Sequence, residues 1–113
     1  MSQEEEFEPV ILCSASSYTK MFYLNPQFRG LPQRIQDELK IACVLFVADV
    51  SGIILLAYNE EGHLDILTKH ETDDIFYDEI GSELKMKQLQ MDKKELFEQL
   101  EQFYDLFFLG NED

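Results

Sequence analysis

Lysine and arginine are scarce in this sequence. Nine of them stand against 23 aspartate and glutamate residues, which gives the 113-residue chain a formal net charge of -14. A field of this sign repels phosphate backbones and anionic lipid head groups. We therefore expect no nucleic-acid binding and no membrane-surface binding. Cations and basic protein surfaces are the partners that this charge favours, although solubility alone accounts for the acids equally well.

Cysteine is scarce as well, and the two that occur, Cys13 and Cys43, form neither a CxxC pair nor a zinc-ligand spacing with the two histidines. We expect both thiols to be reduced and buried. No apolar run approaches the length of about 18 residues that a membrane-spanning helix needs. Residues 1–8 lack the basic and apolar regions of a signal peptide. These absences predict a cytoplasmic protein.

The local sequence motifs of common enzyme and metal sites are missing, among them the phosphate-binding loop, the dinucleotide fingerprint, HExxH, GxSxG and the EF-hand loop. Their absence lowers the expectation of catalysis without excluding it, because catalytic groups are often dispersed in sequence. We expect no cofactor and no metal. The densest acidic group comprises Asp73, Asp74, Asp78 and Glu79. We interpret it as helix-capping residues, with weak cation binding as the alternative.

What the sequence does contain is enough apolar material for a core. Nine phenylalanines, five tyrosines and a hydrophobic fraction of 45% suffice to order a chain of this length as one domain. We expect that domain to span residues 9–110. A flexible acidic lead at residues 1–8 and an acidic tail at residues 111–113 flank it.

The first half of the chain predicts a hairpin and a helix. Apolar runs at residues 10–13 and 19–24 are separated by serine-rich turn chemistry, which is typical of a β-hairpin. From Leu31-Pro32 to Val50, apolar residues recur at steps of three and four, which predicts a helix. The alternative is a strand at residues 41–47, because β-branched residues cluster there.

A second hairpin and a helical segment follow. Residues 52–58 and 63–69 predict two strands joined by an Asn/Gly turn. Residues 71–74 supply capping residues and predict the start of a short helix, which Gly81 weakens; Ser82 is a second candidate N-cap.

From Glu83 to Leu109 the pattern is strongly helical, and one unbroken helix would be about 40 Å long. That length exceeds what a small domain covers, so we expect a long or broken helix, part of which meets another surface. Its apolar stripe is our candidate interaction site, with Lys93 as the interrupting polar position. The stripe consists of Met86, Leu89, Leu96, Phe97, Leu100, Phe103, Tyr104, Phe107 and Phe108.

Five segments resemble a small family of uncharacterised acidic proteins from anaerobic Gram-positive bacteria. These are Leu31-Pro32, Cys43-Val44-Leu45-Phe46, Asp49-Val50-Ser51-Gly52-Ile53, Tyr77-Asp78-Glu79-Ile80-Gly81-Ser82 and Phe107-Phe108-Leu109-Gly110. The resemblance covers nearly the whole chain. It implies a bacterial cytoplasmic setting and a domain of unknown function, and it transfers no catalytic residue.

The predicted fold class is α+β: an antiparallel sheet of two β-hairpins with helices on one face, in the order β-β-α-β-β-α(-α). This order is similar to that of the longin and roadblock scaffold domains, which have a fifth strand that this sequence lacks. The analogy implies protein interaction at the level of fold alone.

Three functional hypotheses follow. The first is a non-enzymatic module that uses the stripe to bind a second copy, as a homodimer, or another protein. The second is an acidic mimic or sequestering factor for a basic protein surface. The third is a small-molecule sensor or enzyme, which requires a deep pocket lined by Cys13, Tyr18, Tyr23 or His63.

Overall fold

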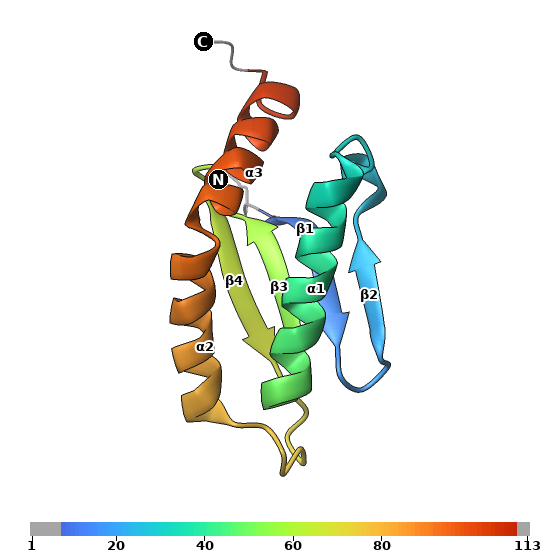
Figure 1. Ribbon diagram of the computed structural model, residues 1–113, viewed down its shortest axis with the longest axis vertical. Coiled ribbons are helices and arrows are strands. Elements are labelled where there is room, and N and C mark those ends of the chain that lie inside the picture. The colour runs from blue at the N-terminus through green and yellow to red at the C-terminus, as the bar shows by residue number, and fades with distance from the viewer. Residues whose placement is uncertain (1–7, 111–113) are drawn as a thin grey trace, which may run out of the picture.

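The computed structural model describes residues 8–110. Its strands β1 (Val10–Ser16), β2 (Met21–Leu24), β3 (Ile53–Tyr58) and β4 (Leu64–Lys69) form one antiparallel sheet of order β2-β1-β3-β4. Its helices are α1 (Gln33–Val50), α2 (Glu79–Asp92) and α3 (Lys94–Phe107), with a short 3-10 turn, η1 (Pro26–Phe28). Figure 1 shows the helices in front of the sheet. The α+β prediction, with the order β-β-α-β-β-α-α, is confirmed. Residues 1–7 and 111–113 lie outside the described chain, so the flexible lead and tail stay predictions.

The first hairpin forms where the serine-rich segment predicted a turn. The Ser16 hydroxyl accepts hydrogen bonds from the backbone N–H groups of Tyr18 and Thr19, at 3.1 and 3.3 Å. A bulge shifts the β1–β3 register between Ile11 and Cys13. Because of this irregularity, the consecutive residues Leu12 and Cys13 are both buried in the core.

Helix α1 confirms the helical interpretation of residues 33–50 and shows that the strand alternative for residues 41–47 is wrong. The period of three and four residues decides the structure here, and it aligns one apolar row toward the sheet. The buried members of that row are Ile35, Leu39, Cys43, Phe46, Val47 and Val50. They pack on β1, β2 and β3 and form the centre of the core.

The chain turns from α1 into β3 through two residues with positive φ, Ser51 at 66° and Gly52 at 99°. A Cβ atom on Gly52 would lie 2.6 Å from the carbonyl oxygen of Lys69. Glycine is therefore required at this position, both for its φ angle and for the close approach of β4.

The predicted helix start at residues 71–74 is wrong, because these residues form turns. The Asp74 carboxylate accepts hydrogen bonds from Tyr18 and Ser51 instead of capping a helix. Asp78 is the cap of α2, and its carboxylate accepts from the Gly81 N–H at 2.8 Å. Ser82 lies buried inside α2 and does not cap it.

The C-terminal helical segment is broken at Lys93, where φ is -112° and ψ is 26°. The Lys93 ammonium donates to the Glu38 carboxylate of α1 at 3.0 Å. The break lets α2 pack on α1 while α3 turns to pack on β4. It explains how a 27-residue helical segment, residues 83–109, fits a small domain.

Candidate functional site

The structure divides the predicted interaction stripe by burial. Leu96, Phe97, Leu100 and Tyr104 are buried in the chain's own core. Met86, Leu89, Phe103 and Phe108 are partly buried and pack against that core. Phe107 is 70% exposed. Most of the stripe thus contributes to the fold of the chain itself, and Phe107 presents the largest free surface among its members.

An aromatic stack explains why this stripe is so rich in rings. Tyr58 of β3 stacks on Tyr104 with ring centroids 4.0 Å apart and on Phe28 at 5.7 Å. Its hydroxyl donates to the Leu100 carbonyl at 2.9 Å. Burial is the largest cause of a raised pKa at Tyr58, and the nearby Cys13 and Glu101 raise it further. The phenol is therefore neutral, and it fastens α3 to the sheet.

A different apolar surface lies on the solvent side of α1. From Ile41 to Val50 the only charged residue is Asp49. Ile41, Val44 and Leu45 are 59, 40 and 62% exposed, and Ala48 beside them is exposed too. Their spacing of three, four and seven residues places them on one side of the helix, opposite its buried row. We call these four residues the outer face of α1.

The sequence carried a signal for this surface. The β-branched residues clustered at 41–47 made a strand arguable, and two of them, Ile41 and Val44, belong to the outer face of α1. A helix that is apolar all round normally lies inside a protein. Here one side has no cover among the described residues.

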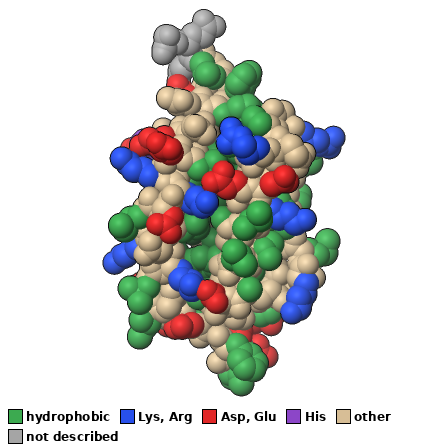
Figure 2. Space-filling view, in the orientation of Figure 1, with side chains coloured by type: hydrophobic (Ala, Val, Ile, Leu, Met, Phe, Trp, Pro, Cys, Tyr) green, Lys and Arg blue, Asp and Glu red, His purple; other side chains and the backbone are tan. Residues whose placement is uncertain are grey.

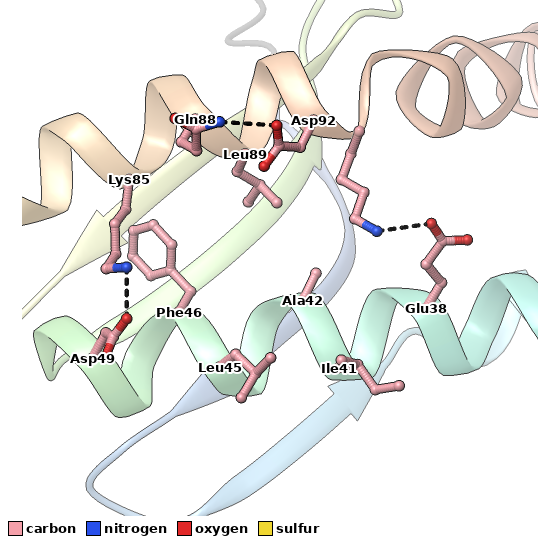
Figure 3. A pocket seen from close by; sticks show the side chains of 11 residues that line it. Glu38, Ile41, Ala42, Leu45, Phe46, Asp49, Lys85, Gln88, Leu89 and Asp92 are labelled. Atoms are coloured by element: carbon pink, nitrogen blue, oxygen red, sulfur yellow. Dashed lines mark hydrogen bonds and ion pairs between the residues drawn. The ribbon is translucent and has the colours of Figure 1, made fainter.

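Beside the outer face, α1 and α2 enclose an open groove of about 530 Å³ (Figure 3). Apolar side chains form its floor and walls: Ile41, Ala42, Leu45, Phe46 and Leu89. An ion pair bridges the two helices at each end. Lys85 contacts Asp49 at 2.6 Å, and Lys93 contacts Glu38 at 3.0 Å.

Charge is distributed unevenly over the molecule. Residues 33–50 and 79–94, which contain α1 and α2, carry six basic and six acidic residues and are net neutral. The remaining three bases and 17 acids account for the whole charge of -14. Figure 2 shows basic and acidic side chains mixed around the apolar centre of this helical side. The strong repulsion that the composition predicts is therefore weakest here.

The acidic group at 73–79 includes one ordered polar centre. Asp74 accepts hydrogen bonds from the hydroxyls of Tyr18 and Ser51 at 2.5 and 2.7 Å. These two hydrogen bonds hold the pKa of Asp74 below its usual range, and the bond from Tyr18 has the larger effect. Desolvation and the bond to Asp74 raise the pKa of Tyr18. Asp74 thus joins the β1–β2 turn, the α1–β3 junction and the loop before α2.

The residues proposed for a small-molecule pocket lie in separate places. Cys13 is buried with its sulfur 4.0 Å from that of Cys43, and both thiols are free, as expected. Tyr18 bonds Asp74, and Tyr23 is exposed on β2. His63 lies 3.6 Å from the Glu101 carboxylate at the far end of the sheet. Within residues 8–110, no group of three or more histidine, cysteine or acidic side chains is arranged to hold a metal ion.

These observations define a two-layer α+β domain with apolar surface left open on its helical side. The chain belongs to a family of unknown function, DUF6145, whose model matches residues 9–112. This confirms the resemblance to an uncharacterised family. Neither a curated protein nor a solved structure matched the chain. None of the helices in the described part of the chain has the length and hydropathy needed to cross a membrane.

Proposed function

We propose that this domain is a non-catalytic protein-interaction module whose docking surface is the outer face of α1 together with the α1–α2 groove. One observation carries the proposal: the last ten residues of α1 are apolar on nearly every side, although only one side meets the core. The net neutrality of residues 33–50 and 79–94 supports it, because a partner approaches there without crossing the acidic field.

The occupant that this surface fits is an amphipathic helix of another protein. Binding of a helix in a groove uses apolar anchors at spacings of three, four and seven residues. The two ion pairs that bound the groove start from Glu38 and Asp49, which lie eleven positions apart on α1. That separation is about 16 Å, or three helical turns, at 1.5 Å per residue. It is long enough for three anchors on one side of a docked helix.

The other two hypotheses receive less support. Outside α1 and α2, one group of carboxylates, which includes Glu61, Glu98 and Glu101, lines the hollow beside α3, and a separate group lies in the loop at 71–78. An acidic mimic requires them on one rigid face. The small-molecule hypothesis requires a deep pocket lined by Cys13, Tyr18, Tyr23 or His63, and these four residues lie in separate places. The free thiols of Cys13 and Cys43 support a reducing, cytoplasmic setting for the module.

Site-specific photo-cross-linking tests the proposal. A photoreactive amino acid is introduced at Leu45, in the docking surface, or at Leu84, on the solvent side of α2, and the full chain is irradiated in its native cell. The two leucines are a matched pair, since they are 62 and 63% exposed. We expect the Leu45 probe to attach to a defined segment of a partner, identified by mass spectrometry, with apolar residues at helical spacing.

A synthetic peptide of the attached segment then provides the quantitative readout. Leu45→Glu should abolish its binding to the purified domain, whereas Leu84→Glu should leave the dissociation constant within about twofold. Circular dichroism verifies that both variants are folded. Identical cross-links from Leu45 and Leu84, or a peptide that binds the Leu45→Glu variant normally, would contradict the proposal.

A further inference from the structure

The sheet has a second apolar surface, on the side away from the helices. Side chains alternate between the two faces of a strand, so the register assigns every second residue to the side away from the helices. We call this side the outer face of the sheet. Its members are Ile11 and Ser14 and Ser16 of β1, Met21 and Tyr23 of β2, Ile53, Leu55 and Ala57 of β3, and Asp65, Leu67 and Lys69 of β4. Seven of these eleven are apolar or aromatic.

The central strand shows how unusual this face is. An antiparallel sheet with one solvated face normally alternates apolar and polar residues, whereas a strand covered on both sides is apolar throughout. In β3, Ile54 and Leu56 are buried under the helices, yet Ile53 and Leu55 on the outer face are apolar as well. On the flanking strands, Tyr23 and Leu67 remain 51 and 43% exposed.

Only two of the eleven residues are charged, and they have opposite signs. Asp65 and Lys69 lie on β4 two positions before and two positions after Leu67. Leu67 pairs with Leu55, Leu55 pairs with Ser14 of β1, and Ser14 pairs with Tyr23. These four residues form one row across the sheet. The row lies midway between the two charges.

We propose that a second copy of this chain packs sheet to sheet on this face, about a two-fold axis that follows the row from Tyr23 to Leu67. Such an axis reverses the strand direction, so that Asp65 of each copy lies opposite Lys69 of the other. Two antiparallel sheets pack in this aligned way at a spacing of about 10 Å, within reach of both charged side chains. The contact is isologous, as in most homodimers.

The Asp65 carboxylate is already oriented within its own chain. It accepts from the Asn59 side-chain amide at 3.2 and 3.4 Å, and it remains exposed. A chain with 23 acids and nine bases repels its own copy over most of its surface. On the outer face of the sheet the two charges cancel, and under the two-fold they form two reciprocal ion pairs. This charge complementarity favours a second copy over an acidic or basic partner.

The inference adds self-association to the docking role of α1 and does not depend on it, because the helices cover the opposite face of the sheet. A dimer built this way leaves both α1 outer faces free. Two docking surfaces per particle would strengthen the binding of a partner that carries two suitable helices.

Charge reversal tests the pairing. Sedimentation equilibrium across micromolar concentrations gives the dimer dissociation constant of the full chain. Asp65→Lys and Lys69→Asp each place like charges opposite each other, and each should weaken the dimer roughly tenfold or more at low salt. The double variant restores opposite charges across the axis and should recover the native constant. Glu60→Lys and Lys87→Asp alter the net charge by the same amounts elsewhere and are the controls.

An apolar variant keeps the test informative. Leu67→Glu should leave the chain folded, because Leu67 is 43% exposed, and should make it monomeric. A native chain that is monomeric overturns the inference and leaves the docking role of α1 standing. A dimer that survives Leu67→Glu, or single reversals that the double variant does not rescue, would overturn it as well. If Leu45→Glu breaks the dimer and Leu67→Glu does not, the chain self-associates through α1 and the inference is wrong.

Discussion

Tyr18 donates a hydrogen bond to the carboxylate of Asp74, and this contact joins two turns that lie 56 residues apart in the chain. The same carboxylate accepts from Ser51, whose φ of 66° is unusual for a residue other than glycine. The strained junction between α1 and β3 is thus held by a charged group from a distant loop. Its stability should depend on the ionisation of that group.

Asp74→Asn should destabilise the fold at neutral pH, and the effect should vanish in acid. The Tyr18 and Ser51 bonds lower the pKa of Asp74 in the folded chain. A lowered pKa contributes stability above the unfolded value, near 4, that is lost as the pH falls through the folded value. Thermal unfolding of both proteins between pH 7 and about pH 2 measures this. The matched control is Asp73→Asn, and a melting difference for Asp74→Asn that persists unchanged in acid would contradict the assignment.

Gly52→Ala should cost about 2 kcal/mol or more of unfolding free energy. The φ of 99° is strained for alanine, and the new Cβ would lie 2.6 Å from the Lys69 carbonyl oxygen, so β4 would have to shift. Gly30→Ala is the control, because its Cβ would meet nothing within 4 Å. Urea denaturation of the two variants gives both values. Equal stabilities would show that the junction tolerates a side chain.

Leu100→Ala and Phe107→Ala compare the stability cost of truncating a buried and an exposed side chain of α3. Leu100 is 1% exposed, so truncation of its side chain should cost about 2–5 kcal/mol. Phe107 is 70% exposed, and its truncation should change the unfolding free energy by less than about 1 kcal/mol. Denaturant titration measures both. A larger loss at Phe107 than at Leu100 would show that the stripe is oriented differently.

The sequence predicted the elements whose hydrophobic period is strong and whose ends carry turn residues. The helix from Gln33 to Val50 and both hairpins are of this kind. Residues 71–78 were harder, because acidic residues suit a helix start and a turn equally well. Contact with the distant residues Tyr18 and Ser51 decides between the two. A local pattern does not contain that information.

The candidate surfaces could not be identified from the sequence for the same reason, because a local pattern does not show what packs against it. The stripe from Met86 to Phe108 is amphipathic, and amphipathicity alone does not distinguish packing on the chain's own sheet from binding to a partner. The sheet buries Leu96, Leu100 and Tyr104 because the break at Lys93 directs α3 onto β4. Conversely, the sequence of α1 did not distinguish its outer face from its buried row, because the residues of both are apolar and suit a core. Only the assembled layers distinguish the inner row from the outer one.

Cys13 and Cys43 should resist thiol reagents in the folded chain. Both are fully buried, and the contact between their sulfurs, together with burial, raises the pKa of Cys13. The thiolate is the reactive form, so reaction with Ellman's reagent at neutral pH requires the core to open. In denaturant both thiols should react at the rate of a free cysteine. Stabilising the fold should slow the native reaction, and destabilising it by Gly52→Ala should speed it. A fast reaction of the native chain that is insensitive to stability would mean that the β1–α1 interface opens locally, independently of global unfolding.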